Sequence, residues 1–159
     1  HCTSSAASDV YKRQILLSKP NCYVTNPITA TIKAFKLMNI KKIALFTPYP
    51  DDVNKTILDY FVSRNIIVTS FTSLNLNLDS EFANVDPNYI LKLLSKIETK
   101  DAEAVFISCT ALSVLNILNQ LESSIKKTVL SSNQTLIWDT IRSIGYKSPI
   151  KGYGKLLEK

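Results

Sequence analysis

Short apolar runs and amphipathic segments alternate along most of the chain. Runs of strand length, rich in β-branched and aromatic residues, lie at 41–49, 66–71, 102–110 and 128–132. Segments whose apolar residues recur at helical spacing lie at 52–65, 86–97, 112–121 and 133–145. Strands that alternate with helices predict an α/β fold, with a parallel Rossmann-like sheet and helices on both of its faces.

Local signals mark where several of the helices begin and end. Asn26 followed by Pro27 predicts the start of an additional helix before the first strand, because Asn caps well and proline suits the first helical position. Asp86 followed by Pro87 predicts a second start of the same kind. Gly145 follows the last amphipathic segment and predicts its end.

A polar stretch from Thr72 to Asp86 separates the second strand from the next helix. It is longer than the usual connection in an α/β unit, so we expect a loop without regular structure. Loops of this length often carry functional residues.

The beginning of the chain has an unusual sequence. Ser4 to Gln14 read SSAASDVYKRQ, which is the codon-by-codon translation of a transposase adapter used in sequencing libraries. No apolar periodicity leads into a cap there, so we expect residues 1–14 to be an adapter-derived artefact without a structural element. The remaining chain divides into an inter-lobe segment and helix (15–40), a C-terminal α/β lobe (41–145) and a C-terminal tail (146–159).

Composition narrows the class of protein. A hydrophobic content of 45% in 159 residues suffices for one domain with its own core. The net charge of +6 comes from lysines scattered along the chain, so we expect no nucleic-acid partner. No apolar run approaches the ~20 residues that span a bilayer, and no signal peptide is visible. We therefore expect a cytoplasmic protein without a membrane partner.

The residue inventory also excludes several chemistries. Three widely spaced cysteines and one histidine form neither a disulfide framework nor a metal site. All three glycines lie at or beyond Gly145, so a P-loop or a dinucleotide-binding turn cannot be built. Asp51 and Asp52 follow a strand as in phospho-acceptor receivers, but the further acidic pocket and the lysine are not evident. We expect a protein without a cofactor.

Polar residues end each predicted strand. The four ends are Thr47-Pro48-Tyr49, Ser70 to Ser73, Ser108-Cys109-Thr110 and Ser131-Ser132-Asn133. Each group alone could merely cap the following helix. Because the carboxyl ends of parallel strands share one edge, the four groups together favour a ligand site there.

Cys109 is the most informative of these residues. A thiol between a strand end and a helix start faces backbone N–H groups and the positive end of the helix dipole, which stabilise thiolate and should lower its pKa. A buried structural cysteine is the equally balanced alternative. Cys22, in a loop before the first helix, is expected to be a packing residue.

Several segments together resemble a known group of enzymes. They are VTNPITATIKAFKLMNIKKIALFTPYPDDVN, EFANVDP, AVFISCTAL, VLSSNQTLIW and PIKGYGKLLEK. From Ile15 to Lys159 their order resembles the C-terminal half of maleate isomerases and arylmalonate decarboxylases, in the aspartate/glutamate racemase superfamily. The resemblance implies one lobe of a pseudo-symmetric enzyme with two α/β lobes, and a tail that returns to the first lobe.

The resemblance also implies roles for particular residues. Cys109 would move a proton at the carbon beside a substrate carboxylate, and Tyr49 would help to bind a carboxylate. Thr110 would offer its backbone N–H and its hydroxyl. Such donors suit an enediolate that forms next to a carboxylate. Thr47 and Asn133, at neighbouring strand ends, complete this part of the expected substrate site.

The chain departs from the resemblance in the long loop. In LDSEF, Asp79 stands where relatives carry asparagine, and Asn77 lies close by. We include both as substrate-binding residues, although an acid that faced a dicarboxylate would repel it. The substrate is therefore predicted only as a small carboxylate or dicarboxylate.

The predicted function is that of a cofactor-independent, cysteine-dependent isomerase, similar to maleate cis–trans isomerase and working by thiol proton transfer or addition. A racemase of the aspartate/glutamate type or an arylmalonate decarboxylase is the alternative enzyme. A non-catalytic ligand-binding module, with an unreactive and buried Cys109, is the alternative from another class. Whether the protein forms a homo-oligomer is left open.

Overall fold

The computed structural model describes residues 5–159, and its centre is a sheet of four parallel strands. They are β1 (Lys42–Thr47), β2 (Ile67–Ser73), β3 (Ala104–Ile107) and β4 (Thr128–Ser131). Their order across the sheet is β2-β1-β3-β4, and every neighbouring pair is parallel. The predicted α/β class and parallel sheet are confirmed.

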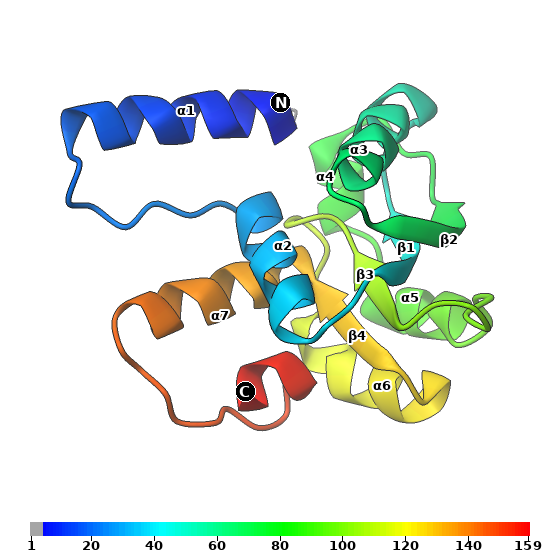
Figure 1. Cartoon of the computed structure of the whole chain (residues 1–159). Coiled ribbons are helices and arrows are strands. Elements are labelled where there is room, and N and C mark those ends of the chain that lie inside the picture. Colours follow the sequence, from blue (N-terminus) through cyan, green and yellow to red (C-terminus); the bar gives the residue numbers. More distant parts are fainter. Residues whose placement is uncertain (1–4) are drawn as a thin grey trace.

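Helices cover both faces of this sheet (Figure 1). The longer ones are α2 (Pro27–Leu37), α3 (Asp51–Ser63), α5 (Pro87–Leu94), α6 (Leu118–Ile125) and α7 (Ser132–Ser143). α2, α3 and α7 pack on one face, and α5 and α6 pack on the other. This distribution follows from right-handed crossovers that leave the central strands in opposite directions.

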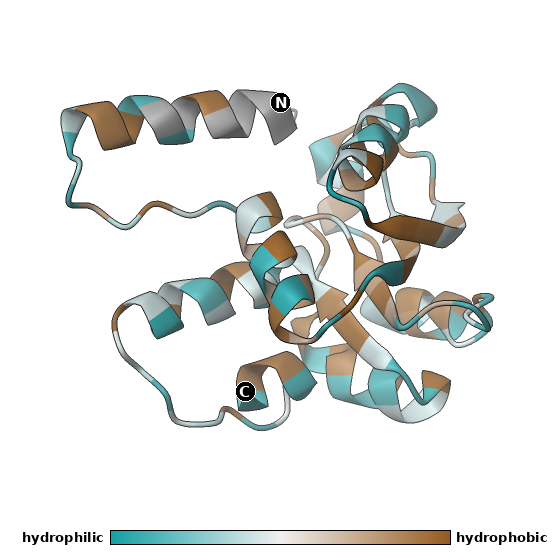
Figure 2. Cartoon of the chain, viewed as in Figure 1, coloured by the Kyte–Doolittle hydropathy of each residue, from teal (hydrophilic) through white to brown (hydrophobic). Residues whose placement is uncertain are grey.

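Each face of the sheet has its own apolar core. On the first face, Phe35 of α2, Phe61 of α3 and Phe106 of β3 form an aromatic cluster with ring centroids 5.5–6.1 Å apart. On the second face, Ile90 of α5 and Leu118 of α6 are fully buried against β1 and β3. Figure 2 shows the hydrophobic positions on the strands and on the helix sides that face them. Successive residues along each buried strand therefore point to opposite faces of the sheet and belong to different cores.

The predicted helix starts are confirmed. Asn26 caps α2, because its side-chain oxygen accepts a hydrogen bond from the Thr29 N–H at 2.8 Å. Asp86 caps α5 by accepting from the Asn88 N–H at 2.9 Å. Gly145 follows the end of α7 with a φ of +85°, which only glycine adopts without cost.

The helix predicted over 112–121 begins later than expected. Residues 108–114 form a loop, a short 3₁₀ turn η1 spans Leu115–Ile117, and α6 begins at Leu118. Leu112 and Val114 are buried although they lie in this loop. The apolar spacing in 112–121 therefore arises because these residues are buried in the core, and it does not indicate a continuous helix.

The polar stretch 72–86 is also more ordered than predicted. β2 continues to Ser73, and a short helix α4 spans Asp79–Ala83. Phe82 anchors this helix in the second core, where it is buried. The apolar residues of this stretch do not recur at helical spacing over more than one turn, which is why the pattern did not predict α4.

The expectation that residues 1–14 form no element is wrong for the described part, since α1 spans Ser5–Ser18. Residues 1–4 lie outside the described residues. α1 lies to one side of the sheet and approaches the covering helices at α3 (Figure 1), and Leu17 is 85% exposed. Alanine, lysine, arginine, glutamine and leucine favour helix locally without any burial, so this helix does not require a core.

We propose that residues 1–14 nevertheless derive from adapter sequence. The codon match is independent of conformation, and Val10 of α1 is 55% exposed. Sequencing source DNA across the junction at Ile15 should yield different codons upstream of it. An uninterrupted open reading frame that encodes SSAASDVYKRQ would contradict the proposal.

The C-terminal tail packs on the lobe that precedes it. Leu156 and Leu157, in the 3₁₀ turn η2 (Lys155–Glu158), are buried in the first core. The Glu122 carboxylate accepts the Lys155 N–H at 3.0 Å, and Arg142 donates to the Leu157 carbonyl at 3.3 Å. The tail was expected to return to a first lobe. Because Leu156 and Leu157 are already buried in this lobe, a contact with a first lobe would have to involve other residues of the tail.

A polar cluster joins the segment before α2 to α7. The Asp139 carboxylate, in a residue 5% exposed, accepts from the hydroxyls of Tyr23 and Thr25 and pairs with the Lys33 ammonium at 3.0 Å. Burial disfavours ionised Asp139, but hydrogen bonds from Thr25, Tyr23 and Lys33 outweigh it and lower the pKa of this carboxyl below 3.8. The cluster ties residues 23–33 to the lobe.

Replacing Asp139 with asparagine should lower the free energy of unfolding at pH 7 by about 1–3 kcal/mol, because buried donors lose a charged acceptor. The pKa of Asp139 is lower in the folded protein than in the unfolded chain. The stabilisation that ionised Asp139 gives to the folded state is therefore present above pH 3.8, and it is lost as the pH falls through the pKa of Asp139 in the folded protein. Urea unfolding at a series of pH values measures this. The exposed Asp59 of α3, changed to asparagine, is the control. A difference that does not shrink toward low pH would contradict the assignment.

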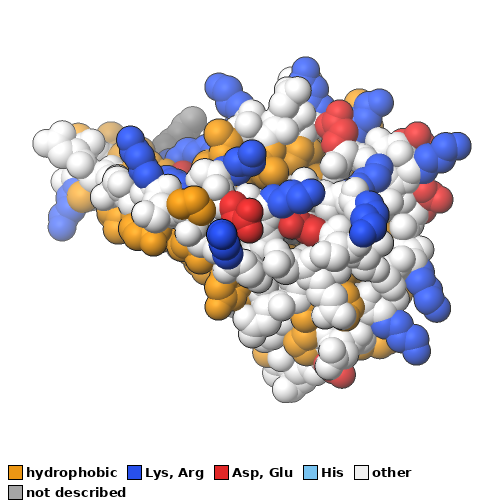
Figure 3. Space-filling view, turned by 90° about the horizontal axis from the view of Figure 1, so that it is seen from below, with side chains coloured by type: hydrophobic (Ala, Val, Ile, Leu, Met, Phe, Trp, Pro, Cys, Tyr) orange, Lys and Arg blue, Asp and Glu red, His pale blue; other side chains and the backbone are white. Residues whose placement is uncertain are grey.

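Charged side chains are dispersed over the surface. Figure 3 shows lysine and arginine side chains spread over one face with acidic side chains between them. No helix in the described part of the chain is long and apolar enough to cross a membrane.

Candidate functional site

The site lies where the connections of the two central strands diverge. The chain leaves β1 through α3 toward β2, and it leaves β3 through α6 toward β4. Connections that part in this way open a crevice at the carboxyl ends of the strands. Tyr49 follows β1 and Cys109 follows β3, while the Ser108 N–H bonds the Phe46 carbonyl at 2.8 Å. Both site residues therefore come to the same end of the sheet.

Cys109 is buried at this end of the sheet. Its side chain is 4% exposed, and its Sγ accepts a hydrogen bond from the Ala111 N–H at 3.3 Å. The expected helix N-terminus is absent behind it, because α6 begins only at Leu118. The helix that follows Cys109 in the chain is therefore not placed to stabilise a thiolate, and the Ala111 N–H is a backbone donor at the sulfur.

A hydrogen-bond network holds the loop after β1. The fully buried Thr47 hydroxyl donates to Asn54 Oδ1 at 2.6 Å, and Asn54 Nδ2 donates to the Tyr49 carbonyl at 2.6 Å. The Ser73 hydroxyl donates to the same carbonyl at 2.5 Å. Thr47, predicted to bind substrate, is therefore placed to position Tyr49. The pattern did not single out Asn54, whose place on the buried side of α3 could have identified it.

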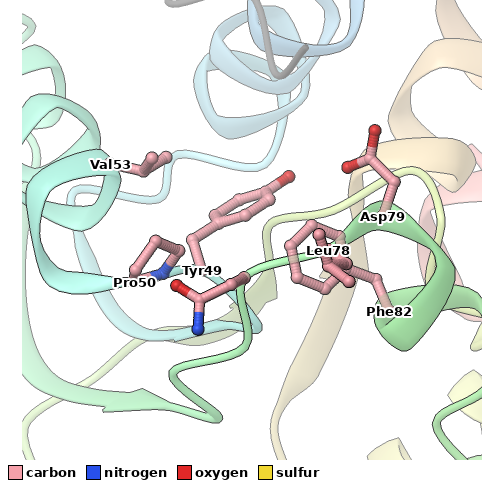
Figure 4. A pocket seen from close by; sticks show the side chains of 7 residues that line it. Tyr49, Pro50, Val53, Leu78, Asp79 and Phe82 are labelled. Carbon is pink, nitrogen blue, oxygen red and sulfur yellow. The ribbon is translucent and has the colours of Figure 1, made fainter.

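Tyr49 lines a hollow of about 400 Å³ (Figure 4). Its ring stands edge-on to Phe82, with centroids 5.4 Å apart and an interplanar angle of 82°. The side chains around the hollow are Tyr49, Pro50, Val53, Asn77, Leu78, Asp79 and Phe82. The structure thus brings together three predicted substrate-binding residues, namely Tyr49, Asn77 and Asp79.

Glu81 fixes the backbone of the segment that carries Asn77 and Leu78, two residues that line this hollow. Its carboxylate accepts the N–H groups of Asn77 at 2.9 Å and of Leu78 at 2.8 Å. A glutamate at this position matches the second half of a capping box, but the N-cap residue is Leu78, whose side chain cannot accept a hydrogen bond, so the sequence lacks the first half of the signal. The segment that carries Asn77 and Asp79 is therefore fixed by its own side chain.

Thr110 and Asn133 line a second hollow, of about 280 Å³. Asn133, near the start of α7, donates from Nδ2 to the Thr110 carbonyl at 2.8 Å. This bond orients the peptide between Thr110 and Ala111, whose N–H bonds Cys109 Sγ. The two predicted residues are thus brought together, but on the β4 side of the Cys109 loop and outside the Tyr49 hollow.

Cys22 does not pack as expected, since it is exposed. It lies in the segment between α1 and α2, which has no sheet or helix face to cover it. Within residues 5–159, no group of three or more His, Cys, Asp or Glu is arranged to hold a metal ion.

Comparison with known proteins agrees with this geometry. The model of the arylmalonate decarboxylase family matches residues 18–157. Arylmalonate decarboxylase of Bordetella bronchiseptica is 25% identical over 138 residues, which are 85% of this chain and 58% of that protein. Maleate isomerase of Geobacillus stearothermophilus is 25% identical over 129 residues, which are 80% of this chain and 51% of that protein. The chain thus spans little more than half the length of these relatives.

Solved structures share the fold. Maleate isomerase Iso from Pseudomonas putida S16 superimposes with a TM-score of 0.87 at 19% identity, over 99% of this chain and 64% of that one. A structure of unliganded arylmalonate decarboxylase gives a TM-score of 0.74 at 25% identity, over 84% of this chain and 58% of that one. With a family model that covers residues 18–157, the chain belongs to the arylmalonate decarboxylase family.

Proposed function

We propose that this chain is the cysteine-bearing lobe of a cofactor-independent isomerase that acts on a small carboxylate or dicarboxylate, as maleate isomerases do. The observation that carries the proposal is the position of Cys109, in the crevice at the central strand ends and in a chain of this family. Its sulfur accepts a backbone hydrogen bond and lies in the same buried cluster as Tyr49.

The proposed chemistry uses the thiol in one of two ways. In the first, the Cys109 thiolate takes a proton from the carbon beside a carboxylate, and the electron pair of the C–H bond forms an enediolate. In the second, the thiolate adds to a carbon of the double bond, rotation follows about the new single bond, and the C–S bond breaks again. A cysteine-to-serine mutant of Nocardia farcinica maleate cis–trans isomerase carries a covalently bound succinylcysteine, so in that protein a thiolate adds at a cysteine other than the one replaced by serine.

Hydrogen-bond donors near the thiol are proposed to stabilise the negative charge that develops on the substrate. The Tyr49 hydroxyl and the Thr110 N–H are proposed to donate to substrate oxygens on which negative charge develops. Fixed donors of this kind stabilise an enediolate without reorganisation during the reaction. Thr47, Asn54 and Asn133 are proposed as positioning residues, because their hydrogen bonds hold the loops of Tyr49 and Cys109.

The complete enzyme is proposed to contain a first lobe as well. The chain spans 58% and 51% of two relatives, which leaves room in them for another domain. A second catalytic residue would come from that lobe. We further propose a cytoplasmic enzyme that needs no nucleic acid, membrane or cofactor, and its oligomeric state is an open experimental question.

An NMR assay of the complete protein tests the proposed reaction. Incubated with maleate in D₂O, the protein should convert the cis double bond to trans. The decarboxylase alternative is supported by the family match, and it predicts release of carbon dioxide from an aryl malonate instead. A racemase would exchange the α-proton of aspartate or glutamate for deuterium. Failure of all these reactions would contradict the enzymatic proposal.

A further inference from the structure

Side chains of α6 and α7 hold the backbone of the C-terminal tail. Gln134, in the first turn of α7, donates from Nε2 to the Tyr153 carbonyl at 2.6 Å. Asn119 of α6 accepts the Gly154 N–H at its Oδ1, at 3.3 Å. The turn η2 that follows packs against β4 and α7 (Figure 1). Because Gln134 is fully buried, its bond to Tyr153 is a fixed internal contact between the tail and the first turn of α7.

The backbone at Gly154 leaves no room for a side chain. Its φ is +83°, in the left-handed region that glycine adopts without cost. A Cβ atom at this position would lie 2.6 Å from Gln134 Nε2, 3.5 Å from Leu118 Cβ and 3.6 Å from the Val129 carbonyl oxygen. The first distance is far shorter than van der Waals contact, and the other two mean that the neighbouring space is filled. An alanine here would therefore force the Gln134 amide away from Tyr153, or lift the tail from α7.

The same turn of α7 also holds the loop of Cys109. Asn133, the residue before Gln134, donates to the Thr110 carbonyl at 2.8 Å. That carbonyl belongs to the peptide group whose N–H, on Ala111, donates to Cys109 Sγ at 3.3 Å. Because a peptide group is a rigid plane, the direction of its carbonyl fixes the direction of its N–H. The placement of the first turn of α7 therefore sets how this N–H meets the sulfur.

We propose that the C-terminal tail positions the Cys109 loop for catalysis. Gly154 and Gln134 are positioning residues that fix the first turn of α7, and Asn133 passes this placement to the peptide that bonds the sulfur. A hydrogen bond to the sulfur favours the thiolate over the thiol, so the reactivity of Cys109 depends on residues that touch no substrate. The inference rests on the proposed function in one respect, because it assigns thiolate chemistry to Cys109.

The pH dependence of Cys109 alkylation in the complete protein provides the test. Iodoacetamide reacts with the thiolate, and peptide mapping reports on Cys109 separately from other cysteines. In Gly154→Ala, the midpoint of the alkylation rate should rise by about one pH unit, as expected for the loss of one hydrogen bond to a charged acceptor. Gly152→Ala is the matched control, since Gly152 has a φ of +93° and no described atom lies within 4 Å of an added Cβ there. Its midpoint should not change.

Two further variants separate positioning from a simple loss of stability. Gln134→Met removes the donor to Tyr153 without adding an atom to the tail, and it should raise the midpoint in the same direction. Asn133→Ala removes the bond to Thr110, so it should raise the midpoint by itself, and adding Gly154→Ala to it should have no further effect. Changes that act independently would add instead. With maleate as substrate, Gly154→Ala should lower kcat about tenfold at nearly unchanged KM, because misplacement of a reacting group slows the chemical step.

The outcomes distinguish this inference from the proposed reaction. No alkylation of Cys109 at any pH, an unchanged midpoint in Gly154→Ala, equal shifts in the two glycine variants, or an additive shift in the double variant would overturn the inference, even where turnover of maleate is observed. The same holds if neither Gly154→Ala nor Gln134→Met folds, as judged by circular dichroism, because the tail is then only structural. A shift that Gly154→Ala, Gln134→Met and Asn133→Ala share supports the inference, even where no substrate is turned over and the proposed isomerisation fails.

Discussion

Replacing Cys109 with serine in the complete protein should lower kcat/KM at least about a hundredfold, the low end of what a general acid–base contributes. Serine keeps the size of the side chain and can still accept the Ala111 N–H that now bonds Sγ. Its hydroxyl is far too weak an acid to exchange protons near neutrality, and it is a poor nucleophile without an activating base. The variant should therefore fold normally and fail in the chemical step.

The matched control is Cys22→Ser, which changes an exposed cysteine far from the crevice and should leave kcat/KM unchanged. In that background, peptide mapping of the alkylated protein reports on Cys109, and a bound substrate analogue should protect the thiol. Thermal unfolding checks that both variants are folded. If Cys109→Ser retains most of the wild-type kcat/KM, then Cys109 is a structural residue. The interpretation as a ligand-binding module would then be favoured.

The second large effect is the loss of activity that we expect when this chain is produced without the rest of the enzyme. Expressed alone, residues 1–159 should not turn over maleate, an aryl malonate, aspartate or glutamate at rates of about 1 per second or above, which are typical of enzymes. The Tyr49 hollow is lined by residues of this lobe alone, so in the isolated chain a substrate would lack the enclosure and the shielding from water that a second lobe provides on the side facing it. In the proposed enzyme, the first lobe covers this side and supplies the second catalytic residue.

Single-turnover and steady-state assays of the isolated chain check this expectation, with the complete protein measured under the same conditions. Circular dichroism establishes that the isolated chain is folded. Its two cores are formed within this lobe, and Leu156 and Leu157 of the tail complete one of them. Turnover by the folded chain at a rate typical of enzymes would show that the lobe is catalytically complete.

The sequence by itself determined the elements that depend on local chemistry. Asn26 and Asp86 predicted helix starts because a side-chain acceptor satisfies an N–H group within a few residues of it, whatever the rest of the fold does. Apolar runs between amphipathic segments predicted the parallel sheet and its two covering layers. The same alternation placed Tyr49 and Cys109 at one edge of that sheet.

The tertiary structure alone decided how the residues at that edge are used. Leu112 appeared to belong to a helix, but contacts with residues distant in sequence bury it in a loop, so the helix that follows Cys109 in the chain does not begin beside it. The hydroxyl of Thr47 is directed to Asn54 of α3, which only the packing of that helix on the sheet makes accessible. Sequence patterns report which residues avoid water and which local groups bond each other. The partners of a side chain at a strand end lie on other elements, so they are set by how those elements pack.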